Sequence, residues 1–315
     1  MKTNLIKNTL ISEITALNEY DINYPFYSAA LEKSIQKQGI ILPLLAYKEE
    51  EKYILIDGFQ RYRIAQKIHL KSLPLQIIDR PENPEDAVRL RYELLKSSTE
   101  ELNVLQKARI LNLVNKHIAA SEKQNKWIQL LKLPKDNNIL KIINWPEHAQ
   151  QYLIKYSVSY NQIKPFLNFS QKDIEALFNF ATELSMRPVE FLKISELLNE
   201  CALNEGISIK EILKEDSVKQ ILSDNEINRN QKTAKLKDII YLRRFPVISK
   251  YRQKMDELNK QFKTNRFMIY YDKTFERSGL QLNMAIKNAE DIEKLLNALN
   301  DSDNKKILIE MLKQI

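Results

Sequence analysis

A glycine turn followed by two closely spaced arginines is the part of this sequence with the clearest capacity for chemistry. Gly58 ends an apolar run, and Arg61 and Arg63 fall in the first turns of the helix predicted to follow, with Gln60 and Tyr62 beside them. A glycine at a strand-to-helix turn lets the backbone approach a ligand, and the N–H groups of a helix start favour an anion. Arginines there add charge-assisted donors for phosphate. The pattern predicts a phosphate-binding turn, and a small α/β module with solvated arginines fits the same residues.

Other catalytic and metal-binding chemistries find little support. The single cysteine, Cys201, excludes a disulfide framework and a cysteine-based zinc site. The three histidines, His69, His117 and His148, lack metal-ligand spacing, so we expect structural or surface roles for them. Only 4 glycines are present, which leaves no room for a Walker loop or a dinucleotide fingerprint. No nucleophile paired with a base and no carboxylate cluster for a nuclease metal is visible.

The elements that must position the turn are predicted to form a small α/β domain. An amphipathic helix from Leu31 runs into Gly39, and a strand follows Pro43. A second strand, Tyr53 to Ile56, leads into the turn at Gly58. The turn is therefore expected between a buried strand and a helix.

The remainder of the chain is predicted to be mostly helical. Residues 85 to about 224 show helical periodicity interrupted by prolines, which predicts a string of short helices. Asn225 to Asn230 is polar and predicts a hinge into a basic helix. From about Met255, two strands, Phe267 to Tyr271 and Leu280 to Ile286, precede a helix capped by Asn288. That helix has apolar positions at Ile292, Leu295, Leu296 and Leu299. A hairpin plus one helix is too small to bury a core alone, which predicts pairing with a second copy.

The positive charge is concentrated in one segment. The chain has a formal net charge of +8, and residues 229–273 hold 13 Lys and Arg against 4 Asp and Glu, a balance of +9. Aromatic residues interleave with these cations, as in surfaces that contact a phosphate backbone. An ordinary solvated helix face is the alternative. The duplex-contacting candidates in this segment are Arg243, Arg244, Lys250 and Arg252.

Length and composition indicate a globular protein of several domains. The chain has 315 residues, of which 43% are hydrophobic. We predict a mostly helical α+β fold with four parts: 1–84, a small α/β domain; 85–224, a helical domain; 225–254, a basic linker or helix; and 255–315, a small C-terminal domain. No signal peptide and no apolar run long enough to span a membrane is evident, so a cytoplasmic protein is expected.

The residues around the glycine turn resemble the N-terminal domain of the ParB family of chromosome and plasmid partition proteins. The resemblance rests on Ser34-Ile35, Gly39-Ile40, Pro43-Leu44, and then Gly58, Arg61, Tyr62, Arg63 and Ala65. Ile139 to Ser170 is similar to the stretch that follows the family's helix-turn-helix, and the final hairpin and helix look like its dimerisation domain. The similarity covers most of the chain in one collinear order.

The resemblance implies a DNA-reading helix-turn-helix at Lys126 to Ile143. The turn would lie near Leu133-Pro134, with Pro134 in a first helical turn, and the recognition helix would begin around Lys135. Asparagine can bond an adenine edge, and lysine can reach a guanine edge or a phosphate. A purely structural helix pair is the alternative. The implied DNA-contacting residues are Lys132, Lys135, Asn137, Asn138 and Lys141.

The resemblance also implies a CTP site, from which this sequence departs at three places. Leu42 stands where a polar glutamine is common, Phe59 and Gln60 replace the glutamate and first arginine of the arginine box, and Leu94 replaces an asparagine. A leucine cannot ligate magnesium, so we expect weak or absent CTP hydrolysis, with phosphate binding left open and a role for magnesium doubtful. Sulfiredoxin-like enzymes share this architecture, but they need a cysteine near the box. The implied nucleotide-binding residues are Gly39, Pro43, Gly58, Gln60, Arg61, Tyr62, Arg63 and Glu93.

Taken with the resemblance, the sequence favours a homodimeric protein that binds double-stranded DNA in partition or mobile-element regulation. The family implies a ParA-like ATPase as a partner, no membrane, and a place on the nucleoid or a plasmid. The alternatives are a nucleotide-dependent phosphotransferase or nuclease on the same fold, and a helical adaptor that binds only protein. The helical middle and the basic segment favour DNA binding over either alternative.

Overall fold

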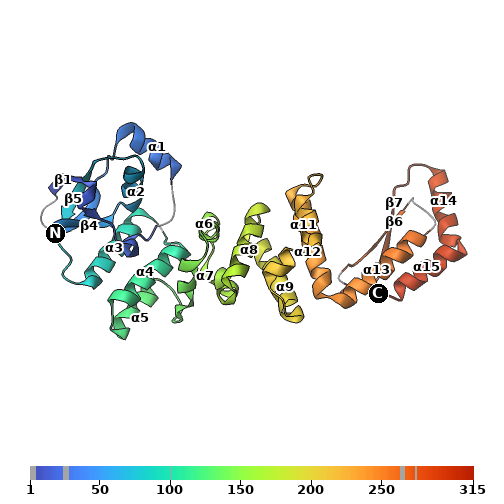
Figure 1. The fold of residues 1–315 in the computed structure, drawn as a ribbon. Helices are drawn as coiled ribbons and strands as arrows, with labels where there is room; N and C mark the ends of the chain where they lie inside the picture. The colour runs from blue at the N-terminus through green and yellow to red at the C-terminus, as the bar shows by residue number, and fades with distance from the viewer. Residues whose placement is uncertain (1–4, 24–27, 100, 263–266, 274) are drawn as a thin grey trace. The chain divides into compact units, whose positions relative to one another are not determined.

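The computed structural model describes residues 5–23, 28–99, 101–262, 267–273 and 275–315 (Figure 1). The chain divides into two compact units, Met1–Lys193 and Ile194–Ile315, each of which is described by itself. The mostly helical α+β class predicted from the sequence is confirmed. The finer four-part division stays a prediction. Among the helices of the described residues, none is long and apolar enough to cross a membrane.

A five-stranded mixed sheet forms the N-terminal part of the first unit. Its order is β1-β5-β3-β4-β2, with β3 and β4 as an antiparallel hairpin and β5 parallel to β3. Leu44, Leu55 and Leu75 are fully buried, so the central strands are covered on their apolar faces. The strands are β1 Leu5–Leu10, β2 Ile14–Thr15, β3 Leu44–Glu49, β4 Lys52–Asp57 and β5 Ser72–Ile78, with 3-10 turns η1 Ile11–Glu13 and η2 Asn18–Tyr20.

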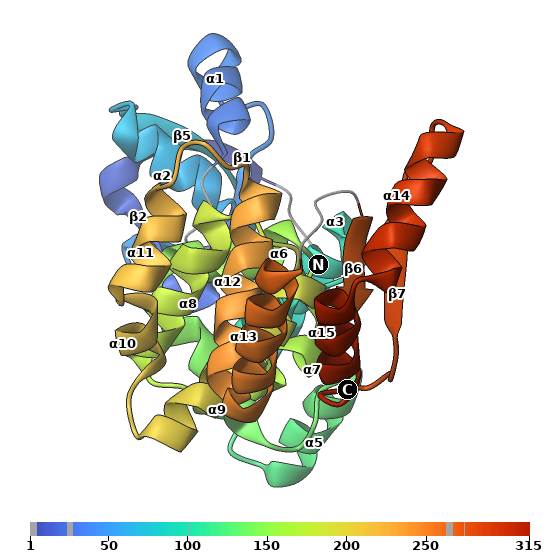
Figure 2. The same cartoon turned by 90° about the vertical axis from the view of Figure 1, so that its right-hand side faces the viewer.

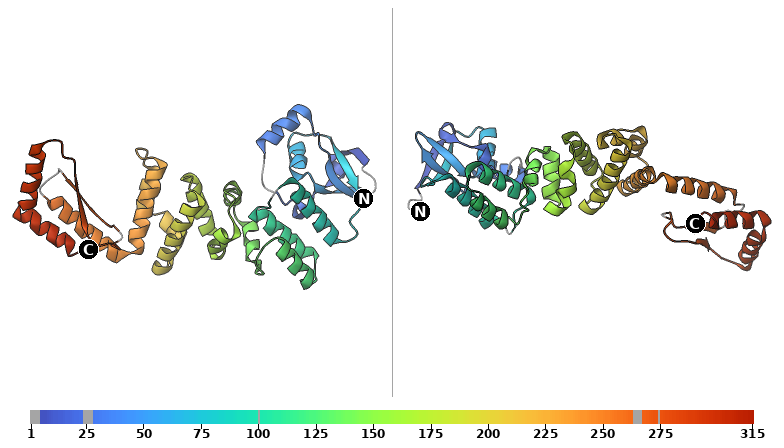
Figure 3. Two further views of the ribbon diagram at one scale, coloured as in Figure 1. Left: turned by 180° about the vertical axis from the view of Figure 1, so that it is seen from behind. Right: turned by 90° about the horizontal axis from the view of Figure 1, so that it is seen from below.

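Two helices flank the central hairpin as the sequence predicts. α1, Ala29–Gln38, is capped by Ser28 and ends at Gly39, and α2, Phe59–Lys67, follows β4 directly. The next helix, α3 Pro84–Ser98, packs on β4, and α4 Val104–His117 packs on α3 (Figure 3). The sheet and the following helices are thereby joined through α3.

The remainder of the first unit is an array of short helices, as expected from the spaced prolines. Pro146 precedes α6, and Pro188 opens α9. Tyr152, Phe166 and Phe178 meet in an aromatic cluster that ties these helices together. The elements are α5 Ser121–Leu130, η3 Asn137–Asn144, α6 Glu147–Lys155, α7 Tyr160–Ile163, η4 Lys164–Asn168, α8 Gln171–Glu183 and α9 Pro188–Glu205, the last of which continues into the second unit.

The element expected as a recognition helix differs from its prediction. It is a 3-10 helix that begins at Asn137, not an α-helix from Lys135, and Pro134 lies before it in the connection from α5. Asp136 caps its start by accepting a hydrogen bond from the Asn138 N–H. The cap fixes the beginning after the proline, which is why Pro134 lies outside the first turn.

The second unit combines further helices with a terminal hairpin. The helices α10 Ile209–Leu213, α11 Asp216–Ser223, α12 Arg229–Arg244 and α13 Pro246–Gln261 precede the strands β6 Phe267–Tyr271 and β7 Leu280–Met284. The predicted hairpin is present, as is the Asn288 cap of α14 Ala289–Asn300. A second terminal helix, α15 Ser302–Leu312, follows, and the sequence analysis did not foresee it (Figure 2).

The C-terminal elements bury a small core of their own, contrary to expectation. Met255 of α13, Ile269 of β6 and Met311 of α15 are buried together with Phe262, because α13 and α15 supply the apolar surface that a hairpin with one helix lacks. Leu295 and Leu299 pack against this core. Large apolar side chains remain exposed on the hairpin and on α14, among them Met268 at 66%, Tyr270 at 46%, Ile292 at 47% and Leu296 at 53%.

Candidate functional site

The glycine turn forms where the sequence places it. Gly58 caps the start of α2 with a φ of +97°, a left-handed conformation that favours glycine. A Cβ at this position would lie 2.8 Å from Leu44 Cγ and 3.1 Å from Arg61 Nη2. Backbone conformation and packing therefore both require glycine, and the turn brings the Arg61 guanidinium against the start of β3.

Arg61 is engaged by the protein itself. Its Nη1 donates to the carbonyl oxygens of Leu42 at 2.6 Å and Pro43 at 2.9 Å. Its Nη2 donates to Asp57 Oδ2 at 3.1 Å. Burial lowers the pKa of Arg61, which the neighbouring Asp57 carboxylate opposes. Among the predicted nucleotide-binding residues, Pro43, Gly58 and Arg61 thus come together.

The second partner of Asp57 is a residue that the sequence analysis missed. Arg91 of α3, whose side chain is 2% exposed, donates from Nη1 to Asp57 Oδ1 at 2.8 Å and from Nε to the Tyr20 carbonyl at 3.0 Å. Burial lowers the pKa of Arg91, and Asp57 counteracts the shift. The Asp57 carboxylate therefore lies between two guanidinium groups.

The other predicted nucleotide-binding residues make contacts different from those of Arg61 and Asp57. Arg63 pairs with the buried carboxylate of Asp21, and the Tyr62 hydroxyl lies inside the domain, 3.4 Å from the Ile14 carbonyl. Gly39 ends α1 and is exposed, and Gln60 is half-buried in the first turn of α2. Glu93 is exposed on α3, whereas Arg91, two residues earlier, is buried. The successive side chains of a helix point about 100° apart, so α3 directs Arg91 and not Glu93 toward the turn.

Two features of these residues differ from the CTP–magnesium site that the resemblance implies. Three of the five N–H donors of Arg61 already bond to two carbonyls and a carboxylate. Leu94, at the position of the expected metal ligand, packs against Tyr47, Ile54 and Ile56 in the core. Among the described residues there is no group of three or more His, Cys, Asp or Glu side chains that could hold a metal ion.

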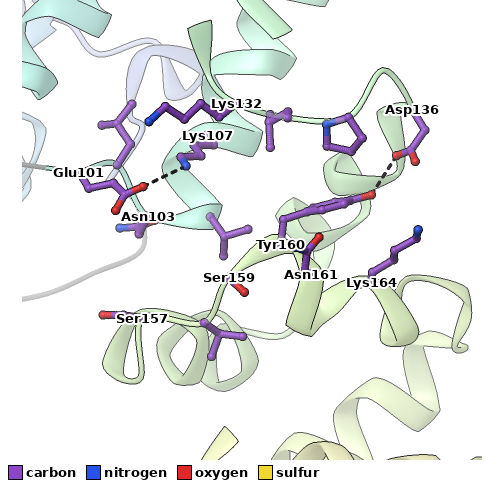
Figure 4. A pocket seen from close by; sticks show the side chains of 15 residues that line it. Glu101, Asn103, Lys107, Lys132, Asp136, Ser157, Ser159, Tyr160, Asn161 and Lys164 are labelled. Atoms are coloured by element: carbon purple, nitrogen blue, oxygen red, sulfur yellow. Dashed lines mark hydrogen bonds and ion pairs between the residues drawn. The ribbon is translucent and has the colours of Figure 1, made fainter. Parts of the chain in front are cut away.

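A cavity of about 650 Å³ lies beside the predicted helix-turn-helix (Figure 4). Three segments line it: the connection into α4, the connection from α5 to η3, and the turn into α7. Lys132 and Ser157 have positive φ values of 54° and 48°, so each of two lining segments bends sharply at the cavity. The polar lining residues are Glu101, Asn103, Lys107, Lys132, Asp136, Ser157, Ser159, Tyr160, Asn161 and Lys164.

Cationic groups outnumber carboxylates in this cavity. Lys107, Lys132 and Lys164 line it, against Glu101 and Asp136. Both carboxylates have partners, because Lys107 lies 3.6 Å from Glu101 and the Tyr160 hydroxyl donates to Asp136 at 3.0 Å. Burial and the bond to Asp136 raise the pKa of Tyr160 to about 12, so its hydroxyl stays a donor at neutral pH. Lys132 and Lys164 are exposed, and the cavity presents positive charge to solvent.

The residues predicted to contact DNA differ in how available they are. Lys132, Lys135 and Asn138 have exposed side chains. Asn137 is exposed and lies 3.4 Å from Asn115. Lys141 donates to the Leu167 carbonyl at 2.9 Å, so its ammonium helps to hold η3 against η4. No pattern in the sequence points to the lining residues Lys107, Tyr160, Asn161 and Lys164, because only tertiary structure brings their segments to one cavity.

Arg243, Arg244 and Arg252 of the basic segment form ion pairs within the second unit. Arg243 contacts Glu205 at 2.5 Å and Glu215 at 2.7 Å, and these bonds raise its pKa. Arg244 contacts Glu200 at 2.5 Å. Arg252 contacts Asp238 at 2.6 Å and donates to the Lys273 carbonyl at 2.8 Å. Lys250, by contrast, is exposed on α13.

Parts of the chain are similar in sequence to known proteins. Residues 10–94 match the ParB N-terminal domain. The chain is 25% identical over 202 residues to stage 0 sporulation protein J of Bacillus subtilis (strain 168), a match that covers 63% of this chain and 68% of that protein. It is 24% identical over 194 residues to the probable chromosome-partitioning protein ParB of Campylobacter jejuni subsp. jejuni. That match covers 61% of this chain and 66% of that protein.

Two solved structures of C-terminally truncated ParB from Caulobacter crescentus also show some likeness. The complex with CTP-gamma-S is 16% identical with a TM-score of 0.26, and the match covers 53% of this chain and 93% of that one. The complex with the centromeric parS site is 15% identical to this chain with a TM-score of 0.29, and the match covers 60% of this chain and 98% of that one. At such low TM-scores neither structure bears on the site residues.

Proposed function

We propose that this chain, which belongs to the ParB family, is a DNA-binding partition protein whose duplex contacts centre on the lysine-lined cavity and the exposed start of η3. The observation that carries the proposal is the convergence of Lys107, Lys132 and Lys164 from three segments on one cavity. The two curated relatives are named for sporulation and for chromosome partition. Partition requires a protein that finds and holds a stretch of duplex.

The chemistry of the cavity suits a DNA backbone. Lysine ammonium groups bind phosphate oxygens as point charges, and hydroxyl and amide groups such as those of Tyr160 and Asn161 donate to the same oxygens. Asn137 and Asn138 begin η3, directly after the connection that contains Lys132 and Asp136, so a strand held at the cavity would bring base edges toward them. We therefore assign the lysines to positioning and the asparagines to base recognition.

We further propose that two copies pair through the C-terminal elements. Met268, Tyr270, Ile292 and Leu296 leave apolar surface exposed although the same elements bury a core. Monomeric proteins seldom expose large contiguous apolar surface, and a symmetric dimer would cover it with the same surface of the other copy. The family further suggests a ParA-like ATPase as a partner, and a cytoplasmic location on the nucleoid or a plasmid.

Duplex binding by matched lysine variants tests the proposal. Fluorescence anisotropy would compare wild type with Lys132→Ala/Lys164→Ala, and with the control Lys33→Ala/Lys37→Ala, which removes two exposed lysines of α1. We expect at least about tenfold weaker binding for the cavity variant, given about 1 kcal/mol or more per lost phosphate contact, and wild-type affinity for the control. Equal affinity for all three proteins would reject the cavity as the contact surface.

A further inference from the structure

A carboxylate holds the place that a phosphate would need at the arginine box. Asp57 Oδ1 lies 2.8 Å from Arg91 Nη1, and Asp57 Oδ2 lies 3.1 Å from Arg61 Nη2. Each carboxylate oxygen thus accepts from a different guanidinium. Carboxylate and phosphate oxygens take the same arginine geometry, so two guanidinium groups around one anion make a site that either group can fill.

The surroundings of Asp57 add to the attraction for an anion. Gly58 provides no side-chain cap for α2, and the first turn of the helix contains no acidic residue. The N–H groups of that turn and the helix dipole therefore favour a negative group, which Asp57 supplies from the residue before the cap. Arg61 is also fixed from its other side by the Leu42 and Pro43 carbonyls, so it cannot swing out without breaking those bonds.

We propose that Asp57 is a built-in counter-ion that excludes nucleotide phosphates from this turn. The arginine box is then a closed structural junction that joins β4, α2 and α3 without a ligand. A buried arginine such as Arg91 needs a paired negative charge. A carboxylate of the same chain has a high effective concentration at the arginine, whereas a nucleotide must be bound from solution. An entering phosphate would have to displace Asp57 and would then lie beside a second negative charge.

The proposal predicts that removing the charge of Asp57 opens the site. In Asp57→Asn, the two guanidinium groups lose their shared anion, and inorganic pyrophosphate should take its place. Thermal melting with and without millimolar pyrophosphate would measure this. We expect a lower melting temperature for the variant, raised by several degrees on adding pyrophosphate, and no such rise for wild type. Calorimetric titration should show pyrophosphate binding at least about tenfold tighter than to wild type.

Two controls separate this effect from nonspecific ion effects. Asp79→Asn removes an equal charge from an exposed position of the same domain and should behave as wild type. Asp57→Asn/Arg61→Ala should lose the pyrophosphate response, because one of the two guanidinium groups is gone. Because DNA is absent from these measurements, their outcome is independent of whether the chain binds a duplex.

Three results would overturn the proposal. The first is a pyrophosphate response in wild type that disappears in Arg61→Ala, since the site would then be open in the natural protein. The second is an Asp57→Asn protein that folds but does not respond. The third is an Asp57→Asn protein that stays unfolded with pyrophosphate present, because a pair of arginines able to hold phosphate would have regained its counter-charge.

Discussion

Tyr160 is the residue that satisfies one of the two carboxylates in the lysine-lined cavity. Its hydroxyl donates to Asp136, one of the two carboxylates there. Tyr160→Phe should leave that carboxylate with only the Asn138 N–H as a donor, which we expect to cost about 1 kcal/mol of unfolding free energy and to weaken duplex binding. Urea unfolding of both proteins over a pH series would measure the first effect.

The difference in unfolding free energy between wild type and Tyr160→Phe should depend on pH in one direction. The pKa of Tyr160 is raised from 10.0 to about 12 in the folded protein. A group with a raised pKa stabilises the fold fully below its unfolded pKa and loses that contribution as pH rises through its folded pKa. The stability gap between wild type and Tyr160→Phe should therefore be constant up to about pH 10 and shrink toward pH 12. A gap that grows above pH 10 would contradict the assignment.

Gly58 and Gly39 offer a matched test of the turn. Both have positive φ, but a Cβ on Gly58 would meet Leu44 at 2.8 Å, whereas a Cβ on Gly39 would meet nothing within 4 Å. Gly39→Ala should cost about 1–3 kcal/mol for backbone strain, because φ 74° with ψ −170° is a region that few residues other than glycine adopt. Gly58→Ala should cost about 1–2 kcal/mol for its left-handed backbone and about 1–3 kcal/mol more for the clash. Equal losses in urea unfolding would show that packing at Leu44 does not constrain the turn.

Among single residues, the glycine turn with Arg61 could be predicted from the sequence, but the pairing of Asp57 with Arg91 could not. Gly58 and Arg61 could be predicted because a glycine between an apolar strand and a helix is a local pattern. Asp57 and Arg91 lie 34 residues apart, and their pairing depends on how α3 packs on the sheet. Charge spacing alone does not reveal such a contact, because many aspartates and arginines could pair equally well.

Some helices and strands can be predicted from local sequence patterns, and others depend on tertiary contacts. The strands of the hairpins and the cap of α14 follow from alternation and from an asparagine before an apolar helix. Whether Asn137–Asn144 would be α or 3-10 was not visible, because its form depends on the Asp136 cap and the Lys141 bond to η4. α15 begins at an Asp301 cap that the sequence analysis overlooked.

The second unit allows arginines held in ion pairs to be separated experimentally from Lys250, which is predicted to contact DNA. Arg243→Ala should remove two ion pairs and lower the stability of the unit by roughly 1 kcal/mol. Lys250→Ala should leave stability unchanged and flatten the slope of log affinity against log salt by about 0.9, the value for one phosphate contact. Urea melts and a salt titration of duplex binding would measure the two effects. If Arg243→Ala flattens the salt slope without changing the urea midpoint, Arg243 contacts DNA and is not a structural residue.

For the whole molecule, self-association should depend on the exposed face of α14. Leu296 is 53% exposed, whereas Leu295 packs against the C-terminal core, so Leu296→Asp tests pairing without entering the core. We expect light scattering to report a dimer for wild type and a monomer for Leu296→Asp. Asn297→Asp, which places the same charge on the next exposed residue of α14, should remain a dimer. A wild-type monomer at micromolar concentration would exclude pairing through this face.

Selection of bound sequences from random duplex DNA tests the central claim most directly. The intact protein would be the bait, with Asn137→Ala/Asn138→Ala as a comparison. A dimer that reads DNA with the start of η3 should enrich a motif of two inverted half-sites, and the variant should bind duplexes without enriching it. If wild type binds no duplex, or enriches no motif at a salt concentration where it binds, the protein is not a site-specific partition protein.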